Sequence, residues 1–415
     1  MLQKHKYLFL LFLLYLITSS CSSGYYVRNT FSYPTPVNTK DKKIQYQIKR
    51  LYHIDDIYAD NLFDAARMNN FSKINDSTFQ VNISPENIPI NDSPWYAFRI
   101  RSEQPKRIYL QLKYTNGHHR YIPKISRNRE IWKKVDTAEI RISKDRRSAI
   151  FPLKIDSAPT WVSAQKIINS TDLKKWLNKL KNRERATEFS SIGKSELGRE
   201  IHFFRIGKGS SKEKKVILLM SRQHPPEVTG FLALEYFIDE LLSKHDLSDD
   251  FYQKYDIWVF PLLNPDGVDL GHWRHNANGV DLNRDWAYFR QAEINTISQF
   301  IVNRAKKYHN KVVLGIDFHS TIKDIYYVCD DSFKTSLPDL KKYWTQSIDQ
   351  LMGNFQSMYA PSPLDKPVSK AWFYLQFGAT GMTYEVGDQT PEKIIEKKAR
   401  IAVVTLMDLL INYPE

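Results

Sequence analysis

Beyond Pro159 the sequence alternates short apolar runs with longer amphipathic stretches, and this rhythm constrains the fold more than any other feature. The strand-like runs cover residues 201–206, 216–220, 257–263, 312–318 and 382–386, and the helix-like patterns lie near 228–243, 290–307, 338–355 and 391–411. Strands that alternate with helices in this way build a sheet whose neighbouring strands are mostly parallel. The sequence therefore predicts an α/β domain over residues 160–413, with a mixed, largely parallel sheet and helices on both faces.

Residues 44–155 have a different character. Short stretches such as 79–83 and 107–112 alternate or run apolar, and turn residues such as Asn91-Asp92-Ser93-Pro94 separate them. This pattern is typical of an all-β sandwich. A chain of 415 residues is long enough for two domains. We therefore expect residues 44–155 to form a β-sandwich accessory domain, without a catalytic cluster of its own.

The N-terminus reads as an export signal. A charged start at residues 4–6 precedes an apolar run over 7–17 that is too short to span a bilayer, and Thr18-Ser19-Ser20-Cys21 follows. This ending resembles a bacterial lipoprotein signal, which implies removal of residues 1–20, lipidation of Cys21 and a tether over 21–43. The protein would then be lipid-anchored in the bacterial cell envelope, on the periplasmic or the outer surface side. Ordinary cleavage with an unmodified Cys21 is the alternative.

Two further properties limit the possible partners. Cys329 is the only other cysteine, so we expect no disulfide. The formal charge is +14, and much of the excess lies between residues 99 and 147. These cations either form solvated strand faces or attract an anionic surface or substrate. Nucleic acid is not expected as a partner, because the chain reads as exported and contains no nucleic-acid motif.

Polar and charged residues gather where the predicted strands end. His224 and Glu227 follow the run 216–220 and precede a helix, where an imidazole and a carboxylate can bind one metal ion. On its own, His-x-x-Glu is a weak signal. Asn264-Pro-Asp-Gly, Arg274, Asp281-x-Asn283-Arg284, His319 and Glu385 also lie at or just beyond strand-like runs. In a sheet with a common strand direction, such ends meet at one crevice.

Taken together, these motifs resemble the zinc carboxypeptidases of the M14 (funnelin) family over about residues 165–413. The sequence His224-Pro-Pro-Glu227 is closest to the cytosolic-type branch, which has His-Pro-Gly-Glu there and carries a β-sandwich before its catalytic domain. The resemblance implies a metallocarboxypeptidase that hydrolyses the C-termini of peptides. It also implies one Zn²⁺, bound by His224, Glu227 and His319, with a fourth position open for water.

The resemblance assigns roles to five further residues. Glu385 would be the general base, and Arg274 would stabilise the oxyanion. Asn283 and Arg284 would bind the terminal carboxylate of the substrate, the arginine through its bidentate fork. Asp281 would accept the second N–H of His224 and so fix the tautomer of its ring.

The prediction of substrate specificity rests on a single residue. Lys370 lies, by its spacing to Glu385, where the family has the residue at the base of the side-chain pocket, which implies a preference for acidic C-terminal residues. A solvated lysine on a loop is the alternative. Pro226 replaces the usual glycine and stiffens the turn. The family's mobile tyrosine has no secure counterpart: Tyr359 is the nearest candidate, but Pro363 stands closer to the expected spacing, so this role stays open.

Two other functions fit the same residues. One is an envelope amidase or peptidase that acts on peptidoglycan stem peptides, which also offer terminal carboxylates. The other is an inactive module that retains the fold to bind carboxylate ends. The sequence leaves the natural substrate and the oligomeric state open.

Overall fold

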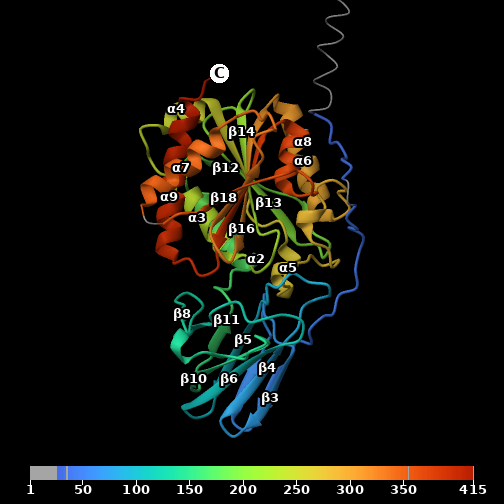
Figure 1. The fold of residues 1–415 in the computed structure, drawn as a ribbon, viewed down its shortest axis with the longest axis vertical. Coiled ribbons are helices and arrows are strands. Elements are labelled where there is room, and N and C mark those ends of the chain that lie inside the picture. Colours follow the sequence, from blue (N-terminus) through green and yellow to red (C-terminus); the bar gives the residue numbers. More distant parts are fainter. Residues whose placement is uncertain (1–25, 34–35, 354, 415) are drawn as a thin grey trace, which may run out of the picture.

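The computed structural model describes residues 26–33, 36–353 and 355–414. Cys21, the signal and the first part of the tether lie outside these residues, so their predicted roles stay predictions. Figure 1 shows a β part, coloured blue to green, at one end of the long axis, and an α/β part, coloured green to red, at the other. Within the described residues no helix combines the length and the hydropathy that crossing a membrane requires.

The N-terminal part consists of two facing sheets. The first has the order β1-β2-β5-β11-β7-β8, with β1 Leu51–Ile54, β2 Ile57–Asp60, β5 Ala97–Ser102, β11 Thr160–Ser163, β7 Lys124–Ser126 and β8 Lys133–Lys134. The second has the order β3-β4-β6-β10-β9, with β3 Asn70–Asn75, β4 Thr78–Ile83, β6 Lys106–Tyr114, β10 Ser148–Ile155 and β9 Arg141–Ile142. Burial alternates along β6 and β10, so each strand turns one face inward. The β region confirms the sandwich expectation, and β11 extends the first sheet beyond residue 155; the domain boundaries themselves stay predictions.

The α/β part is built on an eight-stranded mixed sheet of order β12-β13-β15-β14-β16-β19-β17-β18. Its strands are β12 Ala186–Lys194, β13 Glu200–Ile206, β14 Lys215–Ser221, β15 Tyr255–Phe260, β16 Lys311–Thr321, β17 Ile325–Cys329, β18 Met358–Ser362 and β19 Thr380–Gly387. Strands β15, β14, β16 and β19 are mutually parallel, whereas β13 and β17 flank them antiparallel. The fold class predicted from the sequence is confirmed.

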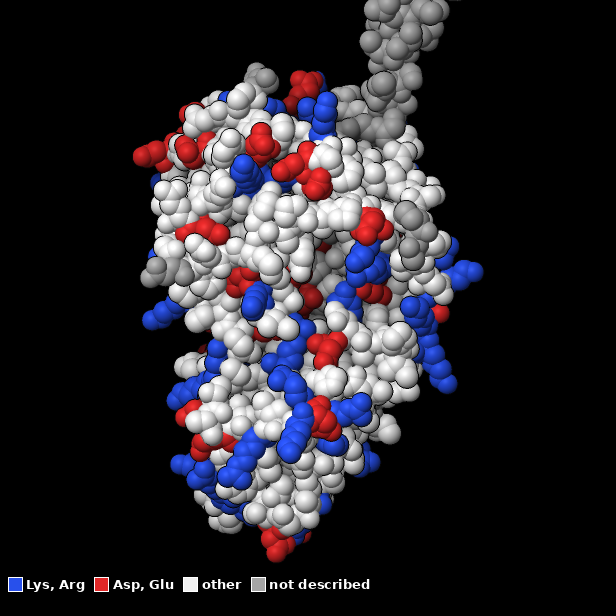
Figure 2. Space-filling view, viewed as in Figure 1, with Lys and Arg blue, Asp and Glu red and all other residues white. Residues whose placement is uncertain are grey.

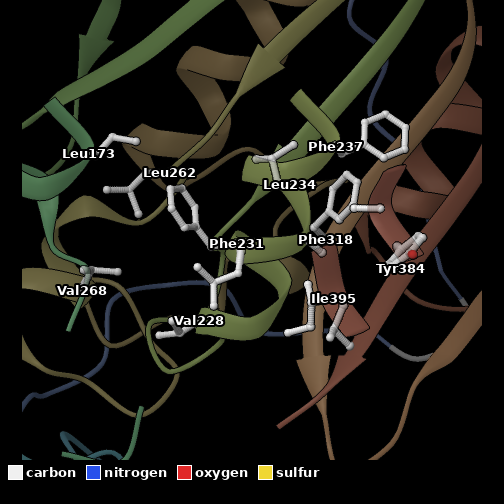
Figure 3. Packing of buried hydrophobic residues seen from close by; sticks show 14 of the residues in the cluster. Leu173, Val228, Phe231, Leu234, Phe237, Leu262, Val268, Phe318, Tyr384 and Ile395 are labelled. Atoms are coloured by element: carbon white, nitrogen blue, oxygen red, sulfur yellow. The ribbon is translucent and has the colours of Figure 1, made fainter. Parts of the chain in front are cut away.

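Helices cover both faces of this sheet (Figure 1). Their bounds are α2 Ser170–Leu180, α3 Val228–Leu241, α4 Ser248–Lys254, α5 Pro265–Leu270, α6 Ala292–Tyr308, α7 Leu340–Met352, α8 Ser369–Phe377 and α9 Glu392–Ile411. Side chains of α3, α7 and α9 share one apolar cluster with the sheet, and side chains of α6 and α8 share another. In Figure 3, Phe231 and Phe237 of α3 lie in the first cluster together with Phe318 of β16 and Tyr384 of β19.

Several elements differ from the sequence expectation. The Asn264-Pro-Asp-Gly motif, whose residue types are typical of a turn, begins helix α5: the Asn264 side chain accepts a hydrogen bond from Gly267 N–H at 2.8 Å, and Pro265 occupies the first turn. Helix α8 and the strands β17 and β18 were not predicted. They are short, and their apolar residues do not repeat over enough turns to reveal a period.

Many cations of the β part are paired. Arg107 binds Glu139 at 3.1 Å, Arg127 binds Asp156 at 2.8 Å and Arg129 binds Asp172 at 2.7 Å. Figure 2 shows Lys and Arg side chains spread over this part among acidic ones. The pairing favours the interpretation as solvated strand faces over a dedicated anionic docking surface.

Candidate active site

Four of the predicted site residues lie at the carboxyl ends of neighbouring parallel strands. His224 and Glu227 follow β14, His319 lies near the end of β16, and Glu385 is the residue directly opposite His319 in the register between β16 and β19. The first turn of α3 comes close to the same strand end: a Cβ on Gly230 would lie 2.4 Å from the His319 carbonyl oxygen. Only glycine permits this approach, which brings Glu227 to His319.

His224, Glu227 and His319 form a compact, buried group whose potential ligand atoms lie within 4.8 Å of one another. Nδ1 of His224 lies 2.8 Å from one carboxylate oxygen of Glu227, and Nδ1 of His319 lies 2.7 Å from the other. Burial alone would raise the pKa of the Glu227 carboxyl, but the two imidazoles lower it below its usual value. Two imidazole nitrogens and a carboxylate are a donor set that suits zinc.

The outer nitrogen of each ring is held by an aspartate. Nε2 of His224 lies 2.9 Å from Asp281 Oδ1, and Nε2 of His319 lies 2.8 Å from Asp317 Oδ2. Each aspartate thereby favours the tautomer with the proton on Nε2, which leaves the Nδ1 lone pair for a cation. The donor set therefore fits a bound metal ion. Asp317 was not predicted, although its position two residues before His319 on one strand face could have revealed it.

The group opens into a cavity of about 360 Å³. Arg274 lies in its wall, where its Nε donates to Asp281 Oδ2 at 2.7 Å. Its two terminal nitrogens make no hydrogen bond to any residue that the structure describes. Burial lowers the pKa of this guanidinium, but Asp281 and Glu227 raise it above its ordinary value. The cavity thus presents two fixed, positively charged donors close to the group formed by His224, Glu227 and His319.

Asn283 and Arg284 lie on the short 3₁₀ helix η2 Leu282–Arg284 and also line the cavity. The side-chain oxygen of Asn283 accepts a hydrogen bond from Ser369 N–H at 3.0 Å, so the amide nitrogen, which lies 3.5 Å from His319 Nε2, is the end that can donate. Arg284 Nη1 donates to the Asn283 backbone carbonyl at 2.8 Å, and a third of its side chain stays exposed. The pair can therefore offer donors to an anionic group in the cavity.

Lys370 lies in the first turn of α8, not on a loop, and it is 4 % exposed. Its Nζ donates to the Val328 carbonyl oxygen at 3.2 Å and to the Ser362 hydroxyl. Among the described residues no carboxylate lies within ion-pair distance of Nζ, and burial lowers the pKa of the ammonium. The alternative of a solvated lysine is wrong: Lys370 is a buried cavity cation with neutral partners.

Glu385 lines the cavity, and its Oε2 is buried without a hydrogen-bond partner among the described residues. Burial raises the pKa of its carboxyl above the ordinary value. A buried polar atom without a partner is costly unless a ligand or water satisfies it. Oε2 is therefore an acceptor available for hydrogen bonding within the cavity.

Several other residues that line the cavity were not predicted, and Arg120 and Tyr327 are two of them. Arg120 comes from the β part, and its guanidinium donates to Asp388, to the Asp92 carbonyl oxygen and to Ser93, while Nη2 makes no bond to a described residue. Tyr327 of β17 also lines the cavity. Tyr359 does not line it, and its buried hydroxyl has no partner among the described residues.

The family model for zinc carboxypeptidases matches residues 173–403. The chain belongs to the zinc carboxypeptidase family. The match covers more than half of the chain and contains all the site residues predicted from the sequence except Cys21. The resemblance noted in the sequence is thereby confirmed, and metallocarboxypeptidase activity is supported at the level of the family.

Relatives of the chain include cytosolic carboxypeptidases. Cytosolic carboxypeptidase 6 of Mus musculus is 32% identical over 111 residues, which cover 26% of this chain and 21% of the relative. Cytosolic carboxypeptidase 2 of Homo sapiens is 30% identical over 190 residues, which cover 42% of this chain and 20% of the relative. The chain thus spans about a fifth of the length of these relatives.

Solved structures share the fold of the chain over both the β part and the α/β part. A metallo-carboxypeptidase from Pseudomonas aeruginosa, in complex with (2-guanidinoethylmercapto)succinic acid, has a TM-score of 0.71 at 19% identity and covers 85% of this chain and 98% of its own. A metallo-carboxypeptidase from Burkholderia cenocepacia has a TM-score of 0.69 at 16% identity, and the likeness covers 85% of this chain and 99% of that structure. At this coverage the likeness includes the β part before the catalytic sheet.

Proposed function

We propose that this protein removes single residues from the C-termini of peptides, with one Zn²⁺ bound by His224, Glu227 and His319. The observation that carries the proposal is the convergence of this buried group with Glu385 and with free guanidinium donors in one cavity. When bound there, zinc polarises the scissile carbonyl and lowers the pKa of the attacking water.

Residues of the chain perform the proton transfer and the charge stabilisation. Glu385 takes a proton from the attacking water through its unpartnered oxygen and passes it to the leaving amine. The free nitrogens of Arg274 donate to the carbonyl oxygen as negative charge develops on it. Asp281 serves both sides of the site, because one of its oxygens binds Arg274 and the other binds His224.

Asn283 and Arg284 restrict the enzyme to substrates whose C-terminus lies in the cavity. The amide nitrogen of Asn283 and the guanidinium of Arg284 bind the terminal carboxylate, a pairing of charge and geometry that an internal peptide bond does not offer. This recognition makes the enzyme an exopeptidase.

Lys370 selects acidic C-terminal residues. Its ammonium is buried, has only neutral hydrogen-bond partners and faces the cavity, so an incoming Glu or Asp side chain supplies the missing counter-charge. An apolar side chain leaves the ammonium buried and unpaired, which is costly. Arg120 adds a further positive charge on the cavity wall.

The direct test is a peptide library varied at the C-terminal position, with amino-acid release measured before and after zinc chelation. We expect release of Glu and Asp in preference to Leu, Phe and Lys, loss with chelator and recovery with Zn²⁺. The matched control is Glu385→Gln, which retains the shape of the side chain and should abolish release. Activity that survives both chelation and Glu385→Gln contradicts the proposal. Release confined to muropeptides would instead favour action on peptidoglycan stem peptides.

We also propose that Cys21 is lipidated and anchors the enzyme in a bacterial envelope. The support is the sequence pattern alone, an apolar run followed by small residues and a cysteine. Expression with an alkyne-labelled fatty acid should label the wild-type protein, whereas Cys21→Ser should remain unlabelled. Equal labelling of the two proteins contradicts the anchor.

A further inference from the structure

A residue of the β part reaches into the loop that carries Arg274. Glu86 lies between β4 and β5 and is completely buried. Among the described residues of the sandwich, none donates a hydrogen bond to its carboxylate. Within residues 26–33, 36–353 and 355–414, the hydrogen bonds that its side chain accepts all come from residues 273–275, which belong to the loop after α5.

The contact consists of three consecutive backbone groups on one carboxylate. The N–H of Trp273 donates to Oε2 at 2.8 Å, and the N–H groups of Arg274 and His275 donate to Oε1 at 3.0 and 2.8 Å. Nδ1 of His275 lies 3.0 Å from the same Oε1. Charge-assisted bonds of this kind are strong, and three in succession fix both the position and the direction of the backbone.

Other contacts of the N-terminal part hold the two ends of the same loop. At its start, Gly271 has a φ of +67° and its Cβ position lies 2.4 Å from the Ala66 carbonyl oxygen. Near its end, Asn87 Nδ2 donates to the Gly279 carbonyl oxygen at 2.9 Å, and Lys42 N–H donates to the Asn278 carbonyl oxygen at 2.7 Å. The loop therefore lies against the N-terminal part along its length, with Glu86 at the residues next to the site.

A short chain of bonds links this contact to the metal-ligand group. From the backbone that Glu86 binds, the Arg274 side chain runs to Asp281 Oδ2 at 2.7 Å, and Asp281 Oδ1 lies 2.9 Å from His224 Nε2. The direction of the two free Arg274 nitrogens depends on where this backbone lies. A displacement of the donors of an oxyanion site lowers the rate of the chemical step more than it lowers substrate binding.

We propose that Glu86 is a positioning residue of the active site: by binding the backbone N–H groups of residues 273–275, it holds Arg274 in place to stabilise the transition state. The β part is then a component of the catalytic site and not only its neighbour. The inference rests on the proposed function of Arg274.

The test uses Glu86→Gln, which retains the size of the side chain but turns one acceptor oxygen into an NH₂ group that faces N–H donors. We expect kcat to fall on the order of tenfold with KM changed by less than about twofold. In an Arg274→Ala background, the same substitution should lower kcat by less than about twofold further, because its effect passes through Arg274. Equal losses in both backgrounds, or an unchanged kcat, overturn the proposal.

Asp256→Asn is the matched control. Asp256 is also a completely buried carboxylate, bound to Arg205 at 2.7 Å, but it lies near the start of β15, at the end of the sheet away from the site. It should lower the melting temperature and leave kcat within about twofold of wild type. If Asp256→Asn lowers kcat as much as Glu86→Gln, loss of stability explains both and the proposal fails.

Hydrogen exchange gives a readout that does not need activity. The amides of residues 273–275 should exchange slowly in the wild type and faster in Glu86→Gln, while the protection of β15 stays unchanged. Fast exchange in the wild type overturns the positioning contact. If Glu86→Gln does not fold, Asn87→Ala replaces it and should lower kcat in the same way by a smaller factor; an unchanged kcat there also counts against the proposal. A wild-type enzyme without peptidase activity, but with protected amides, would instead refute the proposed function.

Discussion

Replacing Lys370 with methionine should change which residue the enzyme releases. Methionine retains the length and much of the volume of the side chain, but it removes the buried ammonium. In the wild type, Nζ bonds to the Val328 carbonyl oxygen and the Ser362 hydroxyl. Under the proposed function, this same Nζ receives the acidic side chain of the substrate. A hydrogen bond to a charged group contributes about 1.5–3 kcal/mol, which corresponds to about a 10- to 150-fold loss in kcat/KM for a substrate that ends in Glu.

The same substitution should help an apolar substrate. A C-terminal Leu leaves the ammonium of the wild type buried and unpaired. In the variant, the methionine side chain makes an apolar contact with this leucine. The Glu/Leu ratio of kcat/KM should therefore fall by on the order of 100-fold. The assay measures release of the last residue from two peptides that differ only at that position. Lys366→Met is the control, because Lys366 lies in the same cavity but is exposed, and loss of its screened charge should change the ratio by less than about twofold. A ratio in Lys370→Met within about twofold of wild type refutes the specificity role.

Three other perturbations have defined outcomes. His319→Ala should abolish both peptide hydrolysis and the rise in melting temperature that added Zn²⁺ produces in the metal-depleted wild type; a retained rise would place the metal elsewhere. Arg120→Ala should raise KM for acidic peptides on the order of threefold with little change in kcat, because the free nitrogen of Arg120 faces the cavity. An unchanged KM in steady-state kinetics would contradict this role of Arg120. Burial raises the pKa of the Glu235 carboxyl to about 7, so its ionisation destabilises the folded state as pH rises from about 4.5 through 7, by up to about 3 kcal/mol. Glu235→Gln should therefore increase the free energy of unfolding at pH 8 and leave it unchanged at pH 4, and equal changes at both pH values would contradict this.

The catalytic sheet could be predicted because its central strands are buried on both faces. Such strands appear as continuous apolar runs, as in Val216 to Met220, and the helices between them bear a regular apolar stripe. The convergence of His224, Glu227 and His319 could be predicted for a related reason: parallel strands bring residues at their carboxyl ends together. The short elements α8, β17 and β18 carry no such period, and their places depend on contacts with the completed sheet.

The contribution of the β part to the site could not be predicted. Arg120 and Glu86 lie far from the catalytic motifs along the chain, and each acts through a contact that exists only after the two parts pack together. In the sequence, Arg120 is one of many cations in a basic region, and Glu86 is a single carboxylate in a loop. Burial and bonding partners distinguish them from their neighbours, and both are properties of the folded chain.

The most direct measurement is anomalous diffraction at the zinc edge from crystals of the protein purified without added metal. The account predicts one peak per chain, about 2.0–2.2 Å from Nδ1 of His224, Nδ1 of His319 and a carboxylate oxygen of Glu227, with the Glu385 carboxyl facing it across the cavity. A zinc peak bound by other residues, or a fully loaded enzyme whose His319 ring points away from the metal, would contradict it.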